Sequence, residues 1–230
     1  MPAEHGHALL LRALQERRPE WLTQKGIQVL EVGTTREPLP GQDSTRALAE
    51  FCKEHGWDFT TCDMDPANGE RARELFKSMD VDFKVVTAKG EEFIASSPRV
   101  WDVVYLDAYD FDHGKHSEVR QERYEQFLGS RIDQKACEVM HLEAMEGLNK
   151  SGKAHCLVVI DDTWKINNQW VGKGPMAVPW AVNNGWSLTM ESDENRAVVL
   201  EKWTDLAIAK RKARMAAGRI KRKVLRQPLP

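Results

Sequence analysis

Short apolar runs alternate with amphipathic segments along most of the chain. Five runs have the length and composition of buried strands: residues 28–32, 58–63, 82–87, 101–106 and 154–160. Helical patterns separate them, at residues 7–22, 44–55, 66–79, from about 91, and 135–148. Strands that alternate with helices predict a mostly parallel sheet with helices on both faces.

Two further runs, residues 186–190 and 197–201, are separated by a polar turn and predict a closing pair of strands. The sequence therefore predicts an α/β fold with a doubly wound, mostly parallel, seven-stranded sheet. The connection between Asp107 and Asp161 is longer than a crossover needs, even with a helix at 135–148. We interpret the polar surplus, residues 108–134, as a helical lid over a substrate.

The composition is that of a soluble globular protein. The 230 residues suit one domain, 41% are hydrophobic and 30% are charged. No run approaches the length of a membrane span, and no secretory signal is visible, so we expect a cytoplasmic protein. The four cysteines form no C-x-x-C pair, which favours reduced, buried thiols.

Charge is distributed unevenly. Residues 206–230 hold nine of the 33 Lys and Arg and no acid, which leaves 24 basic and 35 acidic residues, a formal charge of −11, in the rest. We therefore divide the chain into a domain, 1–205, and a basic tail, 206–230. The tail could bind a polyanion or be a solvated terminal segment. Nucleic acid is the less favoured partner, because no aromatic residues interleave the charges.

Two acids mark the ends of the first two strands. Glu31 and Gly33 close the first, and a glycine there lets the backbone approach a ligand. Asp63 closes the second, where an acid commonly accepts hydrogen bonds from ribose hydroxyls. Each signal alone is weak, since such acids are often helix caps. Together they favour a nucleoside ligand.

These residues resemble motifs of class I S-adenosylmethionine-dependent methyltransferases over about residues 25–205. The resemblance implies S-adenosylmethionine as cofactor and a Rossmann-like methyltransferase fold. Glu31 and Gly33 are similar to the first motif, Asp63 to the ribose-binding acid, and Lys89 and Gly90 to the adenine-contacting turn. One departure is that the loop after Gly33 lacks the usual further glycines. The candidate cofactor-binding residues are Glu31, Gly33, Asp63, Lys89, Gly90 and Asp107.

Three carboxylates follow the fourth and fifth strands: Asp107, Asp161 and Asp162. A parallel sheet brings such strand ends to one edge, and grouped acidic oxygens are the usual ligands of Mg²⁺. A divalent cation lowers the pKa of a bound hydroxyl and positions its oxygen. Single aspartates at strand ends are often only helix caps, so the hypothesis of a metal site depends on the three aspartates lying together.

The pattern is similar to that of magnesium-dependent O-methyltransferases. In the catechol type a lysine follows the first aspartate by three residues, whereas this chain has Asp110 there. It more closely resembles the macrolide sugar O-methyltransferases. The resemblance implies that Asp107, Asp161 and Asp162 bind the metal and that Asp110 is the general base. His113 and His116 are rival bases, unless they are surface residues of the lid.

The preferred function is an S-adenosylmethionine- and divalent-metal-dependent O-methyltransferase that acts on a hydroxyl of a small molecule or glycan. One alternative is a nicotinamide-dependent dehydrogenase, which is disfavoured because G-x-G-x-x-G is missing. Another is a non-catalytic module that binds a polyanion through the basic tail. The sequence identifies no acceptor, and it is compatible with a homo-oligomer.

Overall fold

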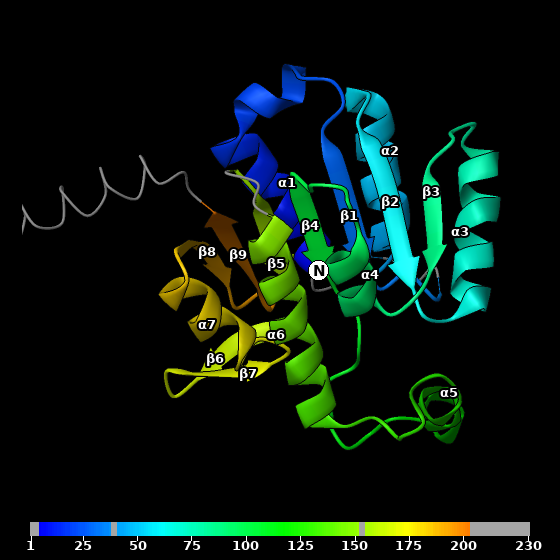
Figure 1. Cartoon of the computed structure of the whole chain (residues 1–230), viewed down its shortest axis with the longest axis vertical. Coiled ribbons are helices and arrows are strands. Elements are labelled where there is room, and N and C mark those ends of the chain that lie inside the picture. Colours follow the sequence, from blue (N-terminus) through cyan, green and yellow to red (C-terminus); the bar gives the residue numbers. More distant parts are fainter. Residues whose placement is uncertain (1–4, 38–40, 152–154, 203–230) are drawn as a thin grey trace, which may run out of the picture.

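The computed structural model describes residues 5–37, 41–151 and 155–202. Its centre is a seven-stranded sheet of order β3-β2-β1-β4-β5-β9-β8 (Figure 1). The strands are β1 Gln28–Val32, β2 Asp58–Asp63, β3 Lys84–Thr87, β4 Val103–Leu106, β5 Leu157–Ile160, β8 Trp186–Ser192 and β9 Ala197–Lys202. Strands β1 to β5 pair in parallel, and β9 is antiparallel to both β5 and β8. The predicted mostly parallel seven-stranded sheet is confirmed.

Helices cover both faces of the sheet. On one face lie α1 Gly6–Arg17, the 3-10 helix η1 Pro19–Thr23, α2 Ser44–His55 and α3 Pro66–Ser78. On the other lie α4 Gly90–Ser96, α6 Gln134–Ser151 and α7 Ala177–Asn183. Successive strand residues point to opposite faces, so Val29 packs in the first core and Leu30 in the second. Both faces of the central strands are therefore apolar.

Local signals fix the ends of the helices. The Asp43 side chain accepts a hydrogen bond from Arg46 N at the start of α2, and Gly56 ends that helix in the left-handed conformation, with φ of 66°. In α3, Asp65 caps the first turn and Pro66 stands at its start. These elements match the bounds that the sequence predicts to within a residue.

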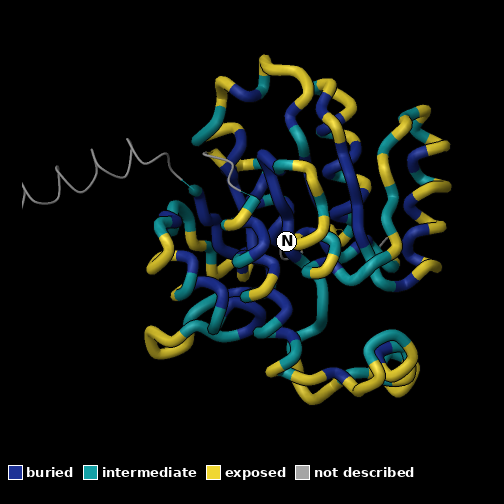
Figure 2. Tube along the Cα trace, viewed as in Figure 1, coloured by how far each residue is buried: buried dark blue, intermediate teal, exposed yellow. Residues whose placement is uncertain are grey.

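The chain order reverses between β1 and β4, which places a crevice at the carboxyl ends of these strands. Helix α5, Glu118–Leu128, lies beyond this edge of the sheet (Figure 1). It belongs to the predicted lid, residues 108–134. Ten of the eleven residues of α5 are exposed or half-buried, whereas the central strands are buried (Figure 2). Tyr124 is its buried residue. The helical insertion is thus present at the edge where ligands bind in such folds.

A hairpin of β6 Thr163–Ile166 and β7 Gln169–Gly172 follows β5 and was not predicted. Its turn is Asn167-Asn168, with φ of 50° and 62°. Asparagine tolerates this conformation, which the tightest hairpin turns require. The hairpin brings the chain back to the end of β5.

The structure describes the cysteines but not the basic tail. All four cysteines are free and buried. No helix in the described part of the chain is long and apolar enough to cross a membrane. The basic tail, residues 206–230, lies outside the described residues.

Candidate functional site

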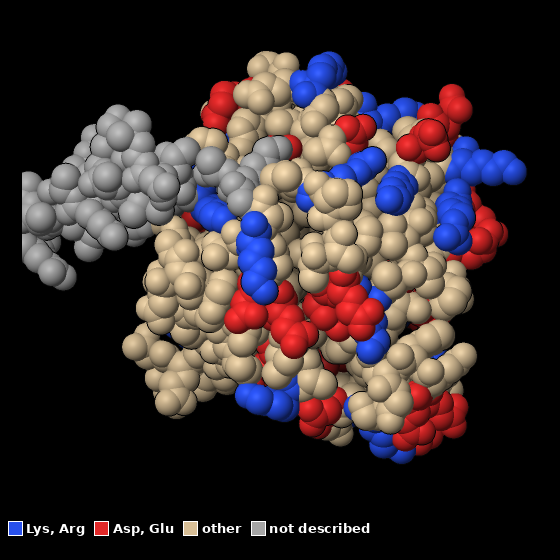
Figure 3. All heavy atoms as spheres, in the orientation of Figure 1, with Lys and Arg blue, Asp and Glu red and all other residues tan. Residues whose placement is uncertain are grey.

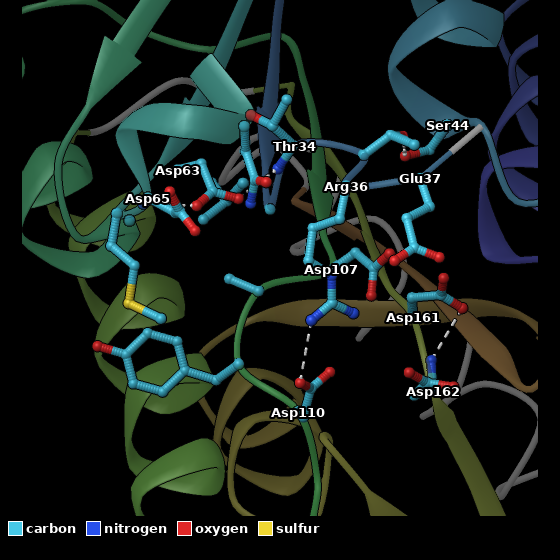
Figure 4. A pocket seen from close by; sticks show the side chains of 18 of the residues that line it. Thr34, Arg36, Glu37, Ser44, Asp63, Asp65, Asp107, Asp110, Asp161 and Asp162 are labelled. Atoms are coloured by element: carbon cyan, nitrogen blue, oxygen red, sulfur yellow. Dashed lines mark hydrogen bonds and ion pairs between the residues drawn. The ribbon is translucent and has the colours of Figure 1, made fainter. Parts of the chain in front are cut away.

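A cavity of about 440 Å³ opens at the carboxyl ends of β1, β2, β4 and β5, with α5 on its outer side. Figure 4 shows two acidic sides: Asp63 and Asp65 on one, Asp161 and Asp162 on the other. Arg36 lies between them. The cavity therefore combines the two groups of candidate residues, those predicted for a nucleoside and those predicted for a metal.

Gly33 allows the loop after β1 to pass close to the end of β4. Its φ is 100°, and a Cβ at this position would lie 2.3 Å from the backbone oxygen of Asp107. The backbone of Asp107 cannot move aside as a flexible side chain could, so a side chain at position 33 would clash with it. At Gly90 a Cβ would lie 2.0 Å from Val32 Cγ1. Both glycines line the cavity, at positions where only a residue without a side chain fits.

Glu31 lies beneath the cavity rather than in its wall. It is fully buried, and its carboxylate accepts hydrogen bonds of 2.7 Å from the hydroxyls of Ser44, Thr45 and Thr61. Burial raises the pKa of Glu31 from 4.5 to about 7, against the effect of these hydrogen bonds. Glu31 therefore joins β1, β2 and the start of α2 beneath the loop.

Asp63 fixes the next part of the loop. Its Oδ2 accepts a 3.0 Å hydrogen bond from Thr34 N, and its Oδ1 one of 2.8 Å from Asp65 N. Burial raises its pKa to about 6, and a hydrogen bond from Asn68 opposes that shift. Asn68 also lines the cavity, and its buried Oδ1 atom has no hydrogen-bond partner among the described residues.

A lysine lies between two of the three predicted metal ligands. The Lys173 ammonium contacts Asp107 Oδ1 and lies 3.1 Å from Asp162 Oδ2. Burial lowers the pKa of Lys173, but the charges of Asp107 and Asp162 outweigh that effect and hold it well above its usual value. Lys173 is therefore a fixed positive charge between two of the carboxylates.

The third carboxylate, Asp161, is satisfied by other donors. Its Oδ1 accepts hydrogen bonds from Gly6 N at 3.1 Å and Asp162 N at 2.8 Å, and its Oδ2 accepts one from the Tyr105 hydroxyl. Burial raises the pKa of Asp161 well above its usual range, and the neighbouring Asp107 adds to the effect. Within the described ranges, no group of three or more His, Cys, Asp or Glu is arranged to hold a metal ion. These residues do not fit the divalent cation that the sequence predicts.

Asp110, the predicted base, is held by two arginines. Both its oxygens accept hydrogen bonds from Arg120 of α5, and Oδ2 lies 3.3 Å from Arg36. Its backbone N–H donates to the Tyr124 hydroxyl. Arg123 of α5 makes a similar ion pair with Asp65. Asp110 and Asp65 thus attach the lid helix to the edge of the sheet.

Two predicted site residues lie away from the cavity. His113 is exposed, accepts a hydrogen bond from Lys115 N and packs against His116, with ring centroids 3.8 Å apart. Lys89 is 38% exposed and lies 3.7 Å from Glu92. Neither belongs to the lining of the cavity. The structure therefore does not bring His113 or the Lys89 side chain to the other candidates.

Several residues that line the cavity were not singled out from the sequence. They are His5, His7, Arg36, Asn68, Arg120, Arg123 and Lys173. For Lys173 a signal was present in its glycine neighbours. A Cβ on Gly172 would lie 1.8 Å from the backbone oxygen of Asp162, and one on Gly174 would lie 2.3 Å from Thr163 Cγ2. Glycines on both sides of a lysine indicate that the backbone there passes close to another segment of the protein.

A second hollow, of about 530 Å³, lies between α4 and α6. Its lining includes Glu91, Glu92, Glu143 and Glu146, and acidic side chains gather over these helices in the centre of the face in Figure 3. It contains none of the strand-end residues. The first cavity is therefore the candidate active site.

No protein-family model matches the sequence, and no curated protein matches it. Among solved structures, TrmN from Thermus thermophilus is similar, with a TM-score of 0.52 and 16% identity over 85% of this chain and 48% of that one. A SAM dependent methyltransferase from Aquifex aeolicus gives a TM-score of 0.44 at 16% identity over 81% and 88%. A precorrin-6y C5,15-methyltransferase from Geobacter metallireducens gives 0.48 at 13% over 83% and 89%. This chain spans about half the length of TrmN. The Rossmann-like methyltransferase fold is confirmed, and the likeness shows the fold alone.

Proposed function

We propose that this protein is an S-adenosylmethionine-dependent methyltransferase that methylates a hydroxyl oxygen of a small molecule or glycan. The observation that carries the proposal is the arrangement of Gly33 and Asp63 at the crevice between β1 and β4. A glycine loop and a strand-end acid at such a reversal point suit a nucleoside ligand. The resemblance to class I methyltransferases indicates that this nucleoside is S-adenosylmethionine.

The residues present fit the cofactor. Asp63 has the position to accept hydrogen bonds from the ribose hydroxyls. Gly33 and Gly90 line the cavity, and the absence of a Cβ at each lets the segments of the cavity wall pack together. Glu31 supports this loop from below and is a positioning residue.

The cofactor supplies a methyl group on a positively charged sulfur, which leaves as a neutral thioether. What the protein must supply is orientation and a place for the proton of the acceptor hydroxyl. Asp107 suits the second task, because it lines the cavity and its Oδ2 has no hydrogen-bond partner among the described residues. Asp110 is less suited, since Arg120 already engages both of its oxygens. We assign Asp110 to the attachment of the lid.

Calorimetric titration with S-adenosylmethionine tests the proposal. Asp63→Ala removes charge-assisted hydrogen bonds and is expected to weaken binding about 10- to 100-fold. Asp58→Ala, at the exposed start of the same strand, is the matched control and should bind as the wild type does. Thermal melting of both variants separates lost binding from lost folding.

Two results would contradict the proposal: wild-type protein that takes up no S-adenosylmethionine, or equal affinity in Asp63→Ala and Asp58→Ala. The acceptor type is tested separately. Transfer of labelled methyl groups from S-adenosylmethionine to a panel of hydroxylated compounds should yield methyl ethers. Transfer confined to amines or carbon acceptors would leave a methyltransferase but exclude O-methylation.

A further inference from the structure

Lys173 is a buried charge in the wall of the cavity. The residue is 1% exposed and follows directly after strand β7. Removing an ammonium ion from water costs several kcal/mol unless opposite charges surround it. A lysine is therefore retained at such a place only where the site needs its charge.

The backbone carries the lysine to the end of β5. Lys173 N donates a 2.9 Å hydrogen bond to the backbone oxygen of Asp162. Asp162 has φ of 44°, the left-handed region that residues other than glycine rarely adopt. The missing side chain of Gly172 makes this approach sterically feasible. The hairpin of β6 and β7 thus positions the Lys173 amine beside Asp107 and Asp162.

The ammonium occupies the position that the sequence assigns to a divalent cation. It pairs with Asp107 and Asp162, two of the three predicted ligands. The third, Asp161, is directed to Gly6, Asp162 and Tyr105. A Cβ at Gly6 would lie 2.5 Å from Asp161 Oδ1, so this contact with the start of α1 is close-packed. A metal ion would have to displace Lys173 and break the bonds of Asp161.

The charges of the described groups are consistent with a permanent cation. The nearest opposing charges to Lys173 come from β4, through Asp107, and from the end of β5, through Asp161 and Asp162. The ammonium contacts Asp107 Oδ1 and lies 3.1 Å from Asp162 Oδ2, so one cation is shared by the two carboxylates.

We propose that Lys173 is the built-in cation of this active site: it holds Asp107 and Asp162 in place of a divalent metal, so the site takes up no divalent metal. The inference rests on the proposed function only in assigning the cavity as the active site. Of the three N–H groups of the ammonium, two serve the aspartates, and no third hydrogen-bond partner is found among the described residues. Lys173 therefore remains a polar group of the cavity wall rather than a closed internal contact.

Binding of Mn²⁺, followed by electron paramagnetic resonance, tests this inference directly, because Mn²⁺ suits carboxylate ligands. Four proteins are compared: wild type, Lys173→Met, Asp107→Asn and the double variant Lys173→Met/Asp107→Asn. The wild type and Asp107→Asn should bind the same amount of Mn²⁺. Lys173→Met should bind one additional ion, because Asp107 and Asp162 then lack a cation, and the double variant should lose that ion again. Thermal melting with and without Mn²⁺ should show a rise in melting temperature for Lys173→Met alone.

An ion bound by the wild type and lost in Asp107→Asn would overturn the inference. So would a folded Lys173→Met protein that takes up no more Mn²⁺ than the wild type. If Lys173→Met does not fold, the comparison of wild type with Asp107→Asn decides alone: equal uptake supports the inference, and loss of an ion contradicts it.

Titration of the wild type with S-adenosylmethionine, with and without a chelator, separates the two proposals. Equal affinity in both conditions is expected. Affinity that requires a divalent metal would overturn the role of Lys173 and leave the methyltransferase standing. Absence of binding in both conditions would overturn the methyltransferase, while the Mn²⁺ comparison would still report on Lys173.

Discussion

Replacing Glu31 by glutamine should change how the stability of this protein depends on pH. Glu31 is fully buried beneath the loop that carries Gly33, and burial raises its pKa from 4.5 to about 7. In the unfolded chain the group is expected to titrate near its ordinary value. Glu31→Gln keeps the size of the side chain and removes its ionisation.

The sign follows from which state holds the proton. Below about pH 4.5 the carboxyl is protonated in both the folded and the unfolded chain, and its contribution is complete. As the pH rises toward about 7, the unfolded chain loses the proton first, which favours unfolding. The interval from 4.5 to about 7 corresponds to about 3 kcal/mol, at about 1.4 kcal/mol per pH unit. The wild type should lose this amount and Glu31→Gln should not.

Urea unfolding followed by tryptophan fluorescence measures the effect, since the chain contains eight tryptophans. The difference in unfolding free energy between Glu31→Gln and wild type should shift by about 3 kcal/mol in favour of the variant between about pH 4.5 and about pH 8. Glu50→Gln, on the exposed side of α2, controls for the loss of one carboxylate. A difference that stays constant with pH would contradict a raised pKa of Glu31 in the folded protein. It would mean that the hydroxyls of Ser44, Thr45 and Thr61 keep Glu31 ionised in the folded protein.

Two further substitutions test the packing around the site. Gly33→Ala should cost about 1–3 kcal/mol of unfolding free energy and weaken S-adenosylmethionine binding, because its Cβ meets the backbone of Asp107. Gly26→Ala, also at positive φ but with nothing within 4 Å of its Cβ, should cost less in urea unfolding and leave binding unchanged. Glu201→Gln should cost about 3 kcal/mol, because the buried Glu201 is paired with Arg17 and Arg18. A loss in urea unfolding no larger than that of the more exposed Glu191→Gln would contradict this estimate.

The framework of the fold could be predicted because its signals are local. Apolar runs of strand length, an Asp before Ser44 and a Gly after His55 each act within a few residues. The insertion at residues 108–134 could be located from the excess length after Asp107, and it contains a helix; its role as a lid stays a prediction. The hairpin after β5 was missed because its apolar residues are few and its turn depends on two asparagines at positive φ.

The side-chain contacts of the site could not be predicted to the same extent. The strand ends were located correctly, since the end of each apolar run marks them. Which partner each carboxylate meets depends on segments far away in the sequence. Gly6 lies 155 positions from Asp161, and Lys173 lies 66 positions from Asp107. Single-sequence patterns contain no information on such pairs.

Asp107, Asp161 and Asp162 have the same side chain but different surroundings. We therefore expect them to have different roles. Asp161 accepts the N–H of Gly6 and the hydroxyl of Tyr105, so it joins the start of α1 to β4 and β5. Asp107 and Asp162 both face Lys173 and the open cavity. Each keeps one oxygen without a hydrogen-bond partner among the described residues, and Asp107 lies beside the loop that carries Gly33. It follows that a change at Asp161 should act mainly through the packing of α1, whereas a change at Asp107 should act on chemistry.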